Sequence, residues 1–292
     1  MPSSKLDISE LDFDLIKRNL KTFLQSQSEF QDYNFEGSGL SILLDTLSYN
    51  THYMSYLANM ATNEVYLDSA DIRKNIVSIA RMLGYTPSSS KSPVAVCDVT
   101  VNNASGTTLT LNKGTIFKSK IGEIGYQFVV NDNITITPIS GVYKFSNVSL
   151  YEGTLVEYKY TVDNNDTDQK FIIPSDKADT DTLKVIVQKS SQDNSRTTYT
   201  YSKDYADVNS DSEVFFLQET DTGRFQVYFG DGIIGKKLDD GNIVILQYIV
   251  TNEDKANGAS AFTLEGNIGG FTNVVVRSIS AAQGGNAPET ND

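Results

Sequence analysis

Residues 225–250 read FQVYFGDGIIGKKLDDGNIVILQYIV, and this stretch decides how the second half of the chain folds. Residues 225–229 alternate apolar and polar side chains, which is the period of a half-buried strand. Residues 243–250 form an almost continuous apolar run, which predicts a strand covered on both faces. Between them, several glycines and an Asp-Gly pair predict two tight turns. The stretch therefore indicates β structure organised around a turn.

The turn after residue 229 allows two interpretations. Glycine permits positive φ on either side of Asp231, whose carboxylate can accept hydrogen bonds from the turn's own amides. Alternatively, Asp231, Asp239 and Asp240 gather a cation or a phosphate, but the calcium-loop spacing and the glycine-rich phosphate loop are both absent. The first interpretation is favoured. The predicted structural turn comprises Phe229, Gly230, Asp231, Gly232, Gly235 and Gly241.

The chain has 292 residues, enough for one large core or two to three smaller ones. Hydrophobic residues make up 39% of it, with 16 Tyr and 14 Phe but no Trp, which suits a folded protein rich in strands. No run of about 18 apolar residues occurs, so the sequence predicts no membrane span. Residues 1–7 contain no apolar signal core, so we expect the protein to stay where it is made.

Residue types suited to catalysis are scarce. Cys97 is the single cysteine, which excludes an internal disulfide, and its apolar neighbours predict a buried, inert thiol. His52 is the single histidine and lies in a helical stretch, so a catalytic triad or a histidine-based metal site is poorly supplied. The chain has many acidic residues, but they form no recognisable arrangement of the paired carboxylates that a hydrolase would use. We predict no enzymatic activity, no catalytic or metal-binding residue, no cofactor and no small-molecule substrate.

Acidic residues exceed basic ones, and the net charge is −13. Most of the excess lies in residues 151–292, which carry 12 basic and 23 acidic side chains. Because such a surface repels phosphate backbones, the sequence predicts no nucleic-acid partner. Two explanations of the acidic half stay open: a solvated face that maintains solubility, and an electrostatic match to a basic partner.

The first 88 residues have the 3.6-residue period of amphipathic helices. The spacing predicts helices over about 10–27, 40–61 and 69–83, with Gly84 and the nearby Pro87 as a stop signal. Their apolar stripes suit either an ordinary small bundle or a bundle completed by helices from other chains. The second interpretation is favoured, because three helices leave stripes wide enough to need partners.

The period changes from 3.6 to 2 after the serine-rich stretch 88–93, which has the composition of a flexible linker. Short strands about ten residues apart predict antiparallel sandwich or barrel sheets. The predicted fold class is α+β and multidomain, with about three N-terminal helices followed by antiparallel β-rich domains. The predicted parts are a helical region at 1–88, a first β subdomain at 89–158, a second at 159–282, and a Gly-Gly hinge at 283–292.

Two sets of motifs resemble known proteins. Phe-Gly-Asp-Gly at 229–232, followed by two further glycines and an apolar strand, resembles the signature of the baseplate J-like family. These are wedge proteins from the baseplates of contractile-tailed bacteriophages and related injection machines. Residues 32–40, 47–53 and 83–87 resemble the N-terminal part of such proteins from T-even-type phages and their marine relatives.

The resemblance implies a structural subunit that joins wedge proteins and neighbouring wedges in a contractile tail. It implies two kinds of partner, other wedge proteins and a second copy, which share a core helical bundle. It also implies a place in the virion, in the tail baseplate, after assembly in the host bacterial cytoplasm. A similar Gly-Gly and Pro-Glu pair precedes a further C-terminal domain in the family, so 283–292 is expected to lead to a domain absent from this chain. The candidates for intermolecular packing are Leu15, Leu20, Phe23, Leu43, Leu47, Met54 and Leu57.

An adhesin or glycan-binding module is the alternative from another class. Tyrosines in 197–205 would be stacking platforms, and the aspartates of 163–168 would hold calcium. The aspartate spacing does not match a calcium hand, so a solvated hairpin loop is the favoured interpretation of that segment. The adhesin also leaves the helical region unexplained.

Overall fold

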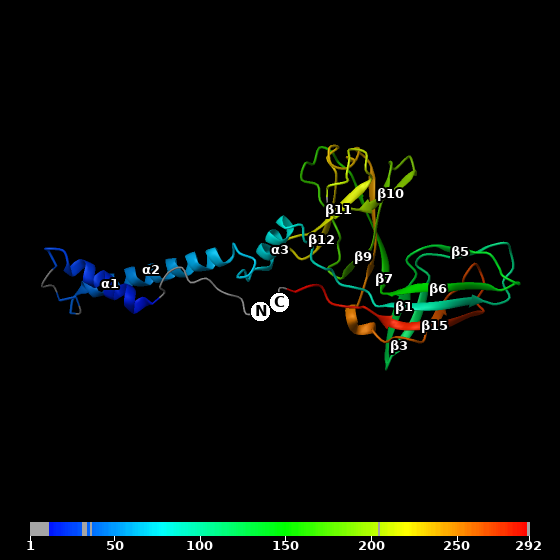
Figure 1. Ribbon diagram of the computed structural model, residues 1–292, viewed down its shortest axis with the longest axis horizontal. Coiled ribbons are helices and arrows are strands. Elements are labelled where there is room, and N and C mark those ends of the chain that lie inside the picture. The colour runs from blue at the N-terminus through cyan, green and yellow to red at the C-terminus, as the bar shows by residue number, and fades with distance from the viewer. Residues whose placement is uncertain (1–11, 31–33, 36, 204, 291–292) are drawn as a thin grey trace. The chain divides into compact units, whose positions relative to one another are not determined.

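The computed structural model describes residues 12–290 apart from 31–33, 36 and 204 (Figure 1). The chain divides into two compact units, with the boundary between Leu83 and Gly84. The described residues of the first unit, the helical unit, form three helices, and those of the second, the β unit, form mainly strands. None of the described helices is both long and apolar enough to cross a membrane.

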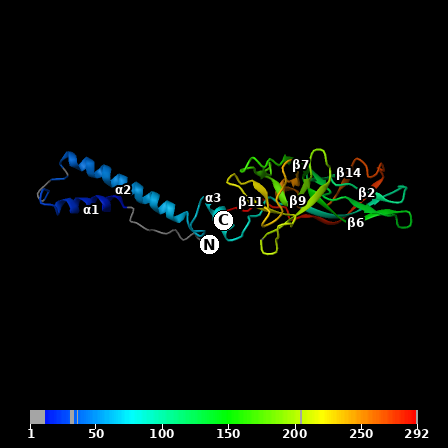
Figure 2. The same ribbon diagram turned by 90° about the horizontal axis from the view of Figure 1, so that it is seen from above.

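The helices of the first unit are α1 (Phe13–Gln25), α2 (Gly39–Asn63) and α3 (Arg73–Met82). α1 begins where the Asp12 carboxylate accepts a hydrogen bond from Leu15 N (2.9 Å), which satisfies one open amide of the first turn. α1 packs beside α2 (Figure 2), and Lys17 Nζ forms an ion pair with Asp45 Oδ1 (2.5 Å) between them. The buried side chains of α2 are Leu44, Ser48 and Asn59.

The start of α3 is fixed to the end of α2 by the carboxylate of Glu64. This carboxylate accepts hydrogen bonds from Asn75 Nδ2 (2.7 Å) and from the backbone amides of Asp71 (3.1 Å) and Ile72 (3.2 Å). The bond from Asn75, helped by the two amides, lowers the pKa of Glu64. A negative charge at this place also complements the helix dipole. α3 begins at Arg73, later than predicted, because the preceding residues form this capping turn.

The first sheet of the β unit has six antiparallel strands in the order β14-β3-β4-β6-β1-β15. Its strands are β1 (Val94–Val101), β3 (Ile116–Ile121), β4 (Ile124–Val129), β6 (Tyr143–Glu152), β14 (Thr263–Glu265) and β15 (Val274–Gln283). A two-stranded sheet of β2 (Leu109–Leu111) and β5 (Ile134–Ile136) packs on the same core. Cys97 is buried in this core, as its neighbours predicted, and burial raises the pKa of its thiol to about 11.

The second sheet has seven strands in the order β7-β13-β9-β10-β11-β12-β8. They are β7 (Thr154–Thr161), β8 (Phe171–Ile172), β9 (Ala178–Gln188), β10 (Arg196–Tyr201), β11 (Val214–Glu219), β12 (Phe225–Phe229) and β13 (Ile243–Val250). Its neighbours pair antiparallel except β10 and β11, which are parallel. The outer strands meet, since Tyr160 Oη donates to Ile172 O (2.6 Å) and the rings of Tyr160 and Phe171 lie 5.6 Å apart. The sheet is therefore barrel-like.

The chain passes from the first sheet to the second through Gly153, between β6 and β7. Its φ of +123° favours glycine, and a Cβ there would lie 2.2 Å from Val250 O. A short 3-10 helix (Glu253–Ala256) follows β13, and β14 and β15 then return to the first sheet. Three helices followed by antiparallel, barrel-like β sheets confirm the predicted fold class. The predicted boundaries at 88, 158 and 282 stay a prediction.

Candidate functional site

The apolar surface of α2 is the first feature that bears on function. The helix has 25 residues and a single charged one, Asp45. Large apolar side chains are exposed along it: Ile42, Leu43, Leu47, Tyr49, Tyr53, Met54, Tyr56, Leu57 and Met60. A helix of a self-contained domain presents charged and polar side chains to water instead.

The seven predicted interface residues fall on two helices. Leu15 and Leu20 are half-buried on α1, whereas Phe23 is exposed near the end of α1. The four on α2 are between 41% and 60% exposed: Leu43, Leu47, Met54 and Leu57. The prediction did not include the exposed tyrosines of α2, although the near absence of charge in 39–63 is a signal for them. Their role as interface residues stays a prediction.

The glycine turn between β12 and β13 is locked by its own backbone. Gly230 crosses Gly235 so closely that a Cβ on Gly230 would lie 2.2 Å from the Gly235 carbonyl. Gly232 N donates to Gly235 O (3.0 Å), and Gly235 N donates to Asn209 O (3.0 Å). At the start of the turn, the ring of Phe229 packs edge-on against that of Phe171 at 5.4 Å. Gly241 has φ +76° in the second turn.

The carboxylate of Asp231 is hydrogen-bonded to backbone amides of this turn. Its Oδ1 accepts hydrogen bonds from Ile234 N (3.0 Å) and Ile233 N (2.9 Å), and these bonds lower the pKa of Asp231. Asp240 Oδ1 instead accepts one from Asn164 N (3.0 Å). Within the described parts of the chain, no three His, Cys, Asp or Glu side chains gather where they could hold a metal.

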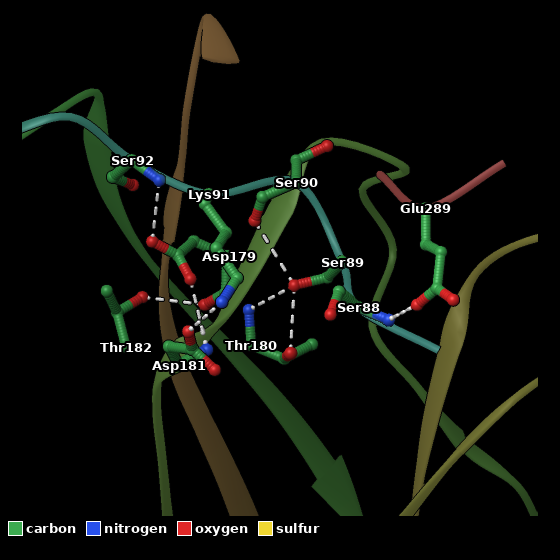
Figure 3. Close-up of polar contacts among 10 residues, drawn as sticks. All are labelled: Ser88, Ser89, Ser90, Lys91, Ser92, Asp179, Thr180, Asp181, Thr182 and Glu289. Atoms are coloured by element: carbon green, nitrogen blue, oxygen red, sulfur yellow. Dashed lines mark hydrogen bonds and ion pairs between the residues drawn. The ribbon is translucent and has the colours of Figure 1, made fainter. Parts of the chain in front are cut away.

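The serine-rich stretch is the third feature, and the prediction that it is a flexible linker was wrong. Ser89, Ser90 and Ser92 are buried in a polar joint formed by residues 85–92, 179–182 and 286–289 (Figure 3). Small hydroxyl side chains can be buried when they and their backbone find hydrogen-bond partners, which composition alone does not reveal.

The start of β9 supplies partners for the Ser89 side chain and for the backbone amide of Ser92, whereas Ser90 Oγ donates to Glu253 Oε1 (3.4 Å). Asp179 Oδ2 accepts a hydrogen bond from Ser92 N (2.8 Å), and Ser89 Oγ accepts one from Thr180 N (2.9 Å). Lys91 Nζ forms an ion pair with Asp181 Oδ2 (3.2 Å). Burial raises the pKa of Asp179, although the hydrogen bonds to Ser92 oppose the shift. The stretch before β1 is therefore fixed to the second sheet.

The same joint holds the segment predicted as a hinge. Lys91 and Asn286 exchange backbone hydrogen bonds (2.9 and 3.1 Å), and Glu289 N donates to Ser88 O (3.0 Å). The Glu289 carboxylate accepts hydrogen bonds from Ser88 N (2.9 Å) and Tyr85 Oη (2.7 Å), and the second bond raises the pKa of Tyr85. The segment is thus paired with the one before β1. Its role as a link to a further domain stays a prediction.

Comparison with known proteins connects these features to one protein class. Residues 12–85 match the family model described as baseplate wedge protein gp6-like, helical domain. The chain is also 28% identical over 303 residues to baseplate wedge protein gp6 of Enterobacteria phage T4. That alignment covers 94% of this chain and 44% of the relative, so the chain spans less than half of the relative's length.

The match to the helical-domain model includes all three described helices, and therefore the exposed face of α2. The alignment with the phage T4 protein takes in nearly the whole chain, so it extends through the β unit. These similarities favour a baseplate protein over the adhesin. The resemblance predicted from the motifs is confirmed: the chain is similar to the gp6-like baseplate wedge proteins, and residues 12–85 correspond to their helical domain.

Proposed function

We propose that this chain is a structural, non-enzymatic subunit of a phage tail baseplate wedge, joining wedge proteins and neighbouring wedges. Its α2 packs against helices of other wedge proteins and of a second copy. Similarity to a structural baseplate protein supports the proposal. The observation that carries it is the exposed apolar face of α2, within the part of the chain that matches the helical domain.

Covering that face would contribute substantial free energy. Full burial of a Leu or Met side chain contributes about 1.5–3 kcal/mol. Leu43, Leu47, Met54 and Leu57 are each roughly half exposed, so their burial by a partner would contribute on the order of 3–6 kcal/mol before the costs of association. Contiguous apolar surface of this kind marks interaction sites on soluble proteins.

The spacing of these residues suits a helical partner. One row of α2 alternates steps of four and three residues, which is the seam of a coiled coil. The row is Leu43, Leu47, Asn50, Met54, Leu57 and Ala61. Asn50 is exposed in the middle of this row. A single polar residue inside such a seam selects one register at a cost in stability. An assembly that needs one fixed alignment of helices would use it in this way.

The proposal places the protein in the virion, in the tail baseplate, after assembly in the cytoplasm of the host bacterium. The chain's role there is mechanical: α2 fixes it to its neighbours while the β unit keeps its own fold. No cofactor, metal, nucleic acid or small-molecule substrate enters this role.

A tagged pull-down tests the proposal. The full chain is purified from cells that express the whole tail gene cluster, and the bound proteins are identified by mass spectrometry. We expect stoichiometric baseplate proteins with the wild type and their loss with Leu43→Asp/Leu47→Asp. The matched control is Ile124→Asp/Ile139→Asp, which places two charges at exposed isoleucines of the β unit. It is expected to retain the partners.

Circular dichroism and thermal unfolding of each variant establish that both units are still folded. Capture of the same proteins by the α2 variant and the wild type, with both folded, would contradict the role of α2. Absence of any baseplate protein from the wild-type sample would contradict the proposed function itself.

A further inference from the structure

Residues 286–290, which we call the strap, lie against residues 85–92, which we call the entry segment. The two run antiparallel, since Lys91 and Asn286 exchange backbone hydrogen bonds and Glu289 N donates to Ser88 O (3.0 Å). The Glu289 carboxylate closes the far end of the pair, where it accepts hydrogen bonds from Ser88 N (2.9 Å, Figure 3) and Tyr85 Oη (2.7 Å). Every residue of the strap except Glu289 is exposed.

The strap and the entry segment are attached to the β unit unequally. The entry segment is also bonded to β9, because Ser89 Oγ accepts from Thr180 N (2.9 Å) and Ser92 N donates to Asp179 Oδ2 (2.8 Å). Among the described residues, the hydrogen bonds of the strap go to the entry segment alone. Pro288 has no backbone donor, which keeps this pairing sparse. The strap can therefore lift off while the entry segment stays on β9.

The root of the strap is fixed much more firmly, at Gly285. Asn257 Nδ2 donates to Gly285 O (2.9 Å), and Gly285 N donates to Asn257 Oδ1 (3.0 Å). A Cβ on Gly285 would lie 2.4 Å from Pro93 Cγ and 2.5 Å from Glu253 O, so the backbone is in close contact there. Immediately before it, β15 pairs with β1 in the first sheet. Separation of the strap should therefore stop at Gly285.

The direction of a load decides how the pair opens. Tyr85 and Glu289 lie at the same end of the antiparallel pair. A pull on both segments at that end loads their bonds one after another, beginning with the Tyr85–Glu289 contact. A pull from opposite ends would load the bonds together. Segments with few buried contacts open at a lower free-energy cost than a packed sheet, so the strap should open before either sheet.

We propose that the strap is a force-sensitive clasp. At rest it holds the entry and the exit of the β unit together. Under tension between them it peels from the entry segment as far as Gly285, while both sheets stay folded. The clasp goes beyond the proposed function: it gives a mechanical subunit a connection that lengthens under load without loss of its core, and it operates in the isolated chain.

Single-molecule force spectroscopy of the full chain tests the clasp, with handles attached at Leu83→Cys and Thr290→Cys. Both positions are exposed, and the native Cys97 is inert because it is buried and its thiol has a pKa of about 11. The three helices lie outside the loaded stretch. We expect a first step of about 30 Å, as 85–88 and 286–290 become extended, at less than half the force that unfolds the sheets.

The control for geometry moves one handle to Thr272, as Leu83→Cys/Thr272→Cys. Thr272 is exposed and lies just before β15, whose first residue, Val274, pairs with Val101 at the end of β1. This arrangement pulls β1 and β15 from opposite ends and leaves the strap outside the loaded stretch. The early step should therefore be absent.

A matched pair of substitutions tests the contact that closes the clasp. Glu289→Ala removes the carboxylate and should lower the force of the first step at least twofold. Glu123→Ala removes the same charge from an exposed residue in the turn between β3 and β4, and it should leave that force unchanged. In bulk, Glu289→Ala should reduce the amide protection of Ser88 and leave that of β1 as it is.

A single rupture without an early step, in the pull between residues 83 and 290, would overturn the proposal. So would an early step of the same length in the control geometry, a step force that Glu289→Ala does not change, or unaltered protection of Ser88 in that variant. None of these measurements involves a partner. Loss or retention of baseplate proteins by Leu43→Asp/Leu47→Asp bears only on the proposed function, so the two failures are distinguishable.

Discussion

The helical unit and the β unit place their apolar side chains in opposite ways. In the β unit, two clusters of buried residues fill the sheets, with side chains such as Phe145 and Tyr248 almost completely covered. In α2, two of the three buried residues are the polar Ser48 and Asn59, while leucines, methionines and tyrosines are exposed. A folded domain usually does the reverse. The difference, seen in the described residues, agrees with the proposed role of α2 as a surface that other chains cover.

The largest loss of stability is expected from a substitution in the glycine turn between β12 and β13. Gly230→Ala would put a Cβ 2.2 Å from the Gly235 carbonyl and 2.4 Å from Ile234 O. The turn would have to open, at a cost of about 3 kcal/mol or more. Denaturant unfolding of the full chain measures this as a lower midpoint for the β transition. Gly125→Ala is the control, since nothing lies within 4 Å of its Cβ; equal costs for the two variants would contradict the role of the crossing.

Substitution of two adjacent leucines of α2 compares the buried side of the helix with its exposed side. Leu44 is 2% exposed and Leu43 is 53% exposed. Leu44→Ala should cost about 2–4 kcal/mol, because it leaves a cavity on the buried side of α2. Leu43→Ala should cost less than about 1 kcal/mol in the isolated chain and should weaken partner capture. Thermal unfolding followed at the helical signal measures both, and a Leu43→Ala cost as large as that of Leu44→Ala would show that α2 is covered within the chain.

A smaller effect tests the polar joint. Ser89 Oγ shares a hydrogen bond with Thr180 Oγ1 (2.8 Å) and accepts one from Thr180 N. Ser89→Ala leaves that partly buried amide without its partner, at a cost of about 1–2 kcal/mol. Ser88 is exposed and enters the joint through its backbone, so Ser88→Ala should cost close to nothing. Indistinguishable unfolding midpoints would mean that the joint contributes little to the stability of the β unit.

The smallest effect is the pH dependence of α3. The folded-state pKa of Glu64 lies below its ordinary value of 4.5. Its contribution to stability is therefore fully present above that value and is lost as the pH falls through the folded pKa. Amide protection at the start of α3, which is the exchange rate corrected for the intrinsic rate at each pH, should fall over this range in the wild type. In Glu64→Gln, this protection should already be lower at neutral pH and should depend less on pH; parallel protection profiles for the two proteins would contradict the capping role.

Much of the fold could be predicted because its signals are local. The alternation in 225–229 and the apolar run in 243–250 match β12 and β13. Such strands can be predicted because the pattern of apolar residues along a strand follows which of its faces are buried. The pairing of β15 with β1 could not be predicted, because strand partners distant in sequence leave no periodic mark. The burial of the serines could not be predicted for a related reason: their partners at Asp179 and Thr180 lie about ninety residues away in the sequence.

The candidate site was predictable to a similar degree. The stripe that contains Leu43 and Leu47 follows from helical spacing, but the spacing alone could not say which stripe faces α1 and which faces outward. The structure separates them, with Leu44 inward and Leu43 outward. The cavity of about 360 Å³ that the loop 163–169 forms with the turn at Gly230 could not be predicted from the sequence, because the two segments lie some seventy residues apart.

Hydroxyl-radical footprinting of the isolated chain and of the assembled baseplate tests the central claim most directly, because Tyr53, Met54 and Met60 of α2 are readily oxidised when exposed. Tyr205, an exposed tyrosine of the β unit, is the internal reference. If α2 is completed by other chains, its three side chains are oxidised in the isolated chain and protected several-fold in the assembly, relative to Tyr205. Equal oxidation of α2 in both samples would contradict the claim that its apolar face is an assembly surface.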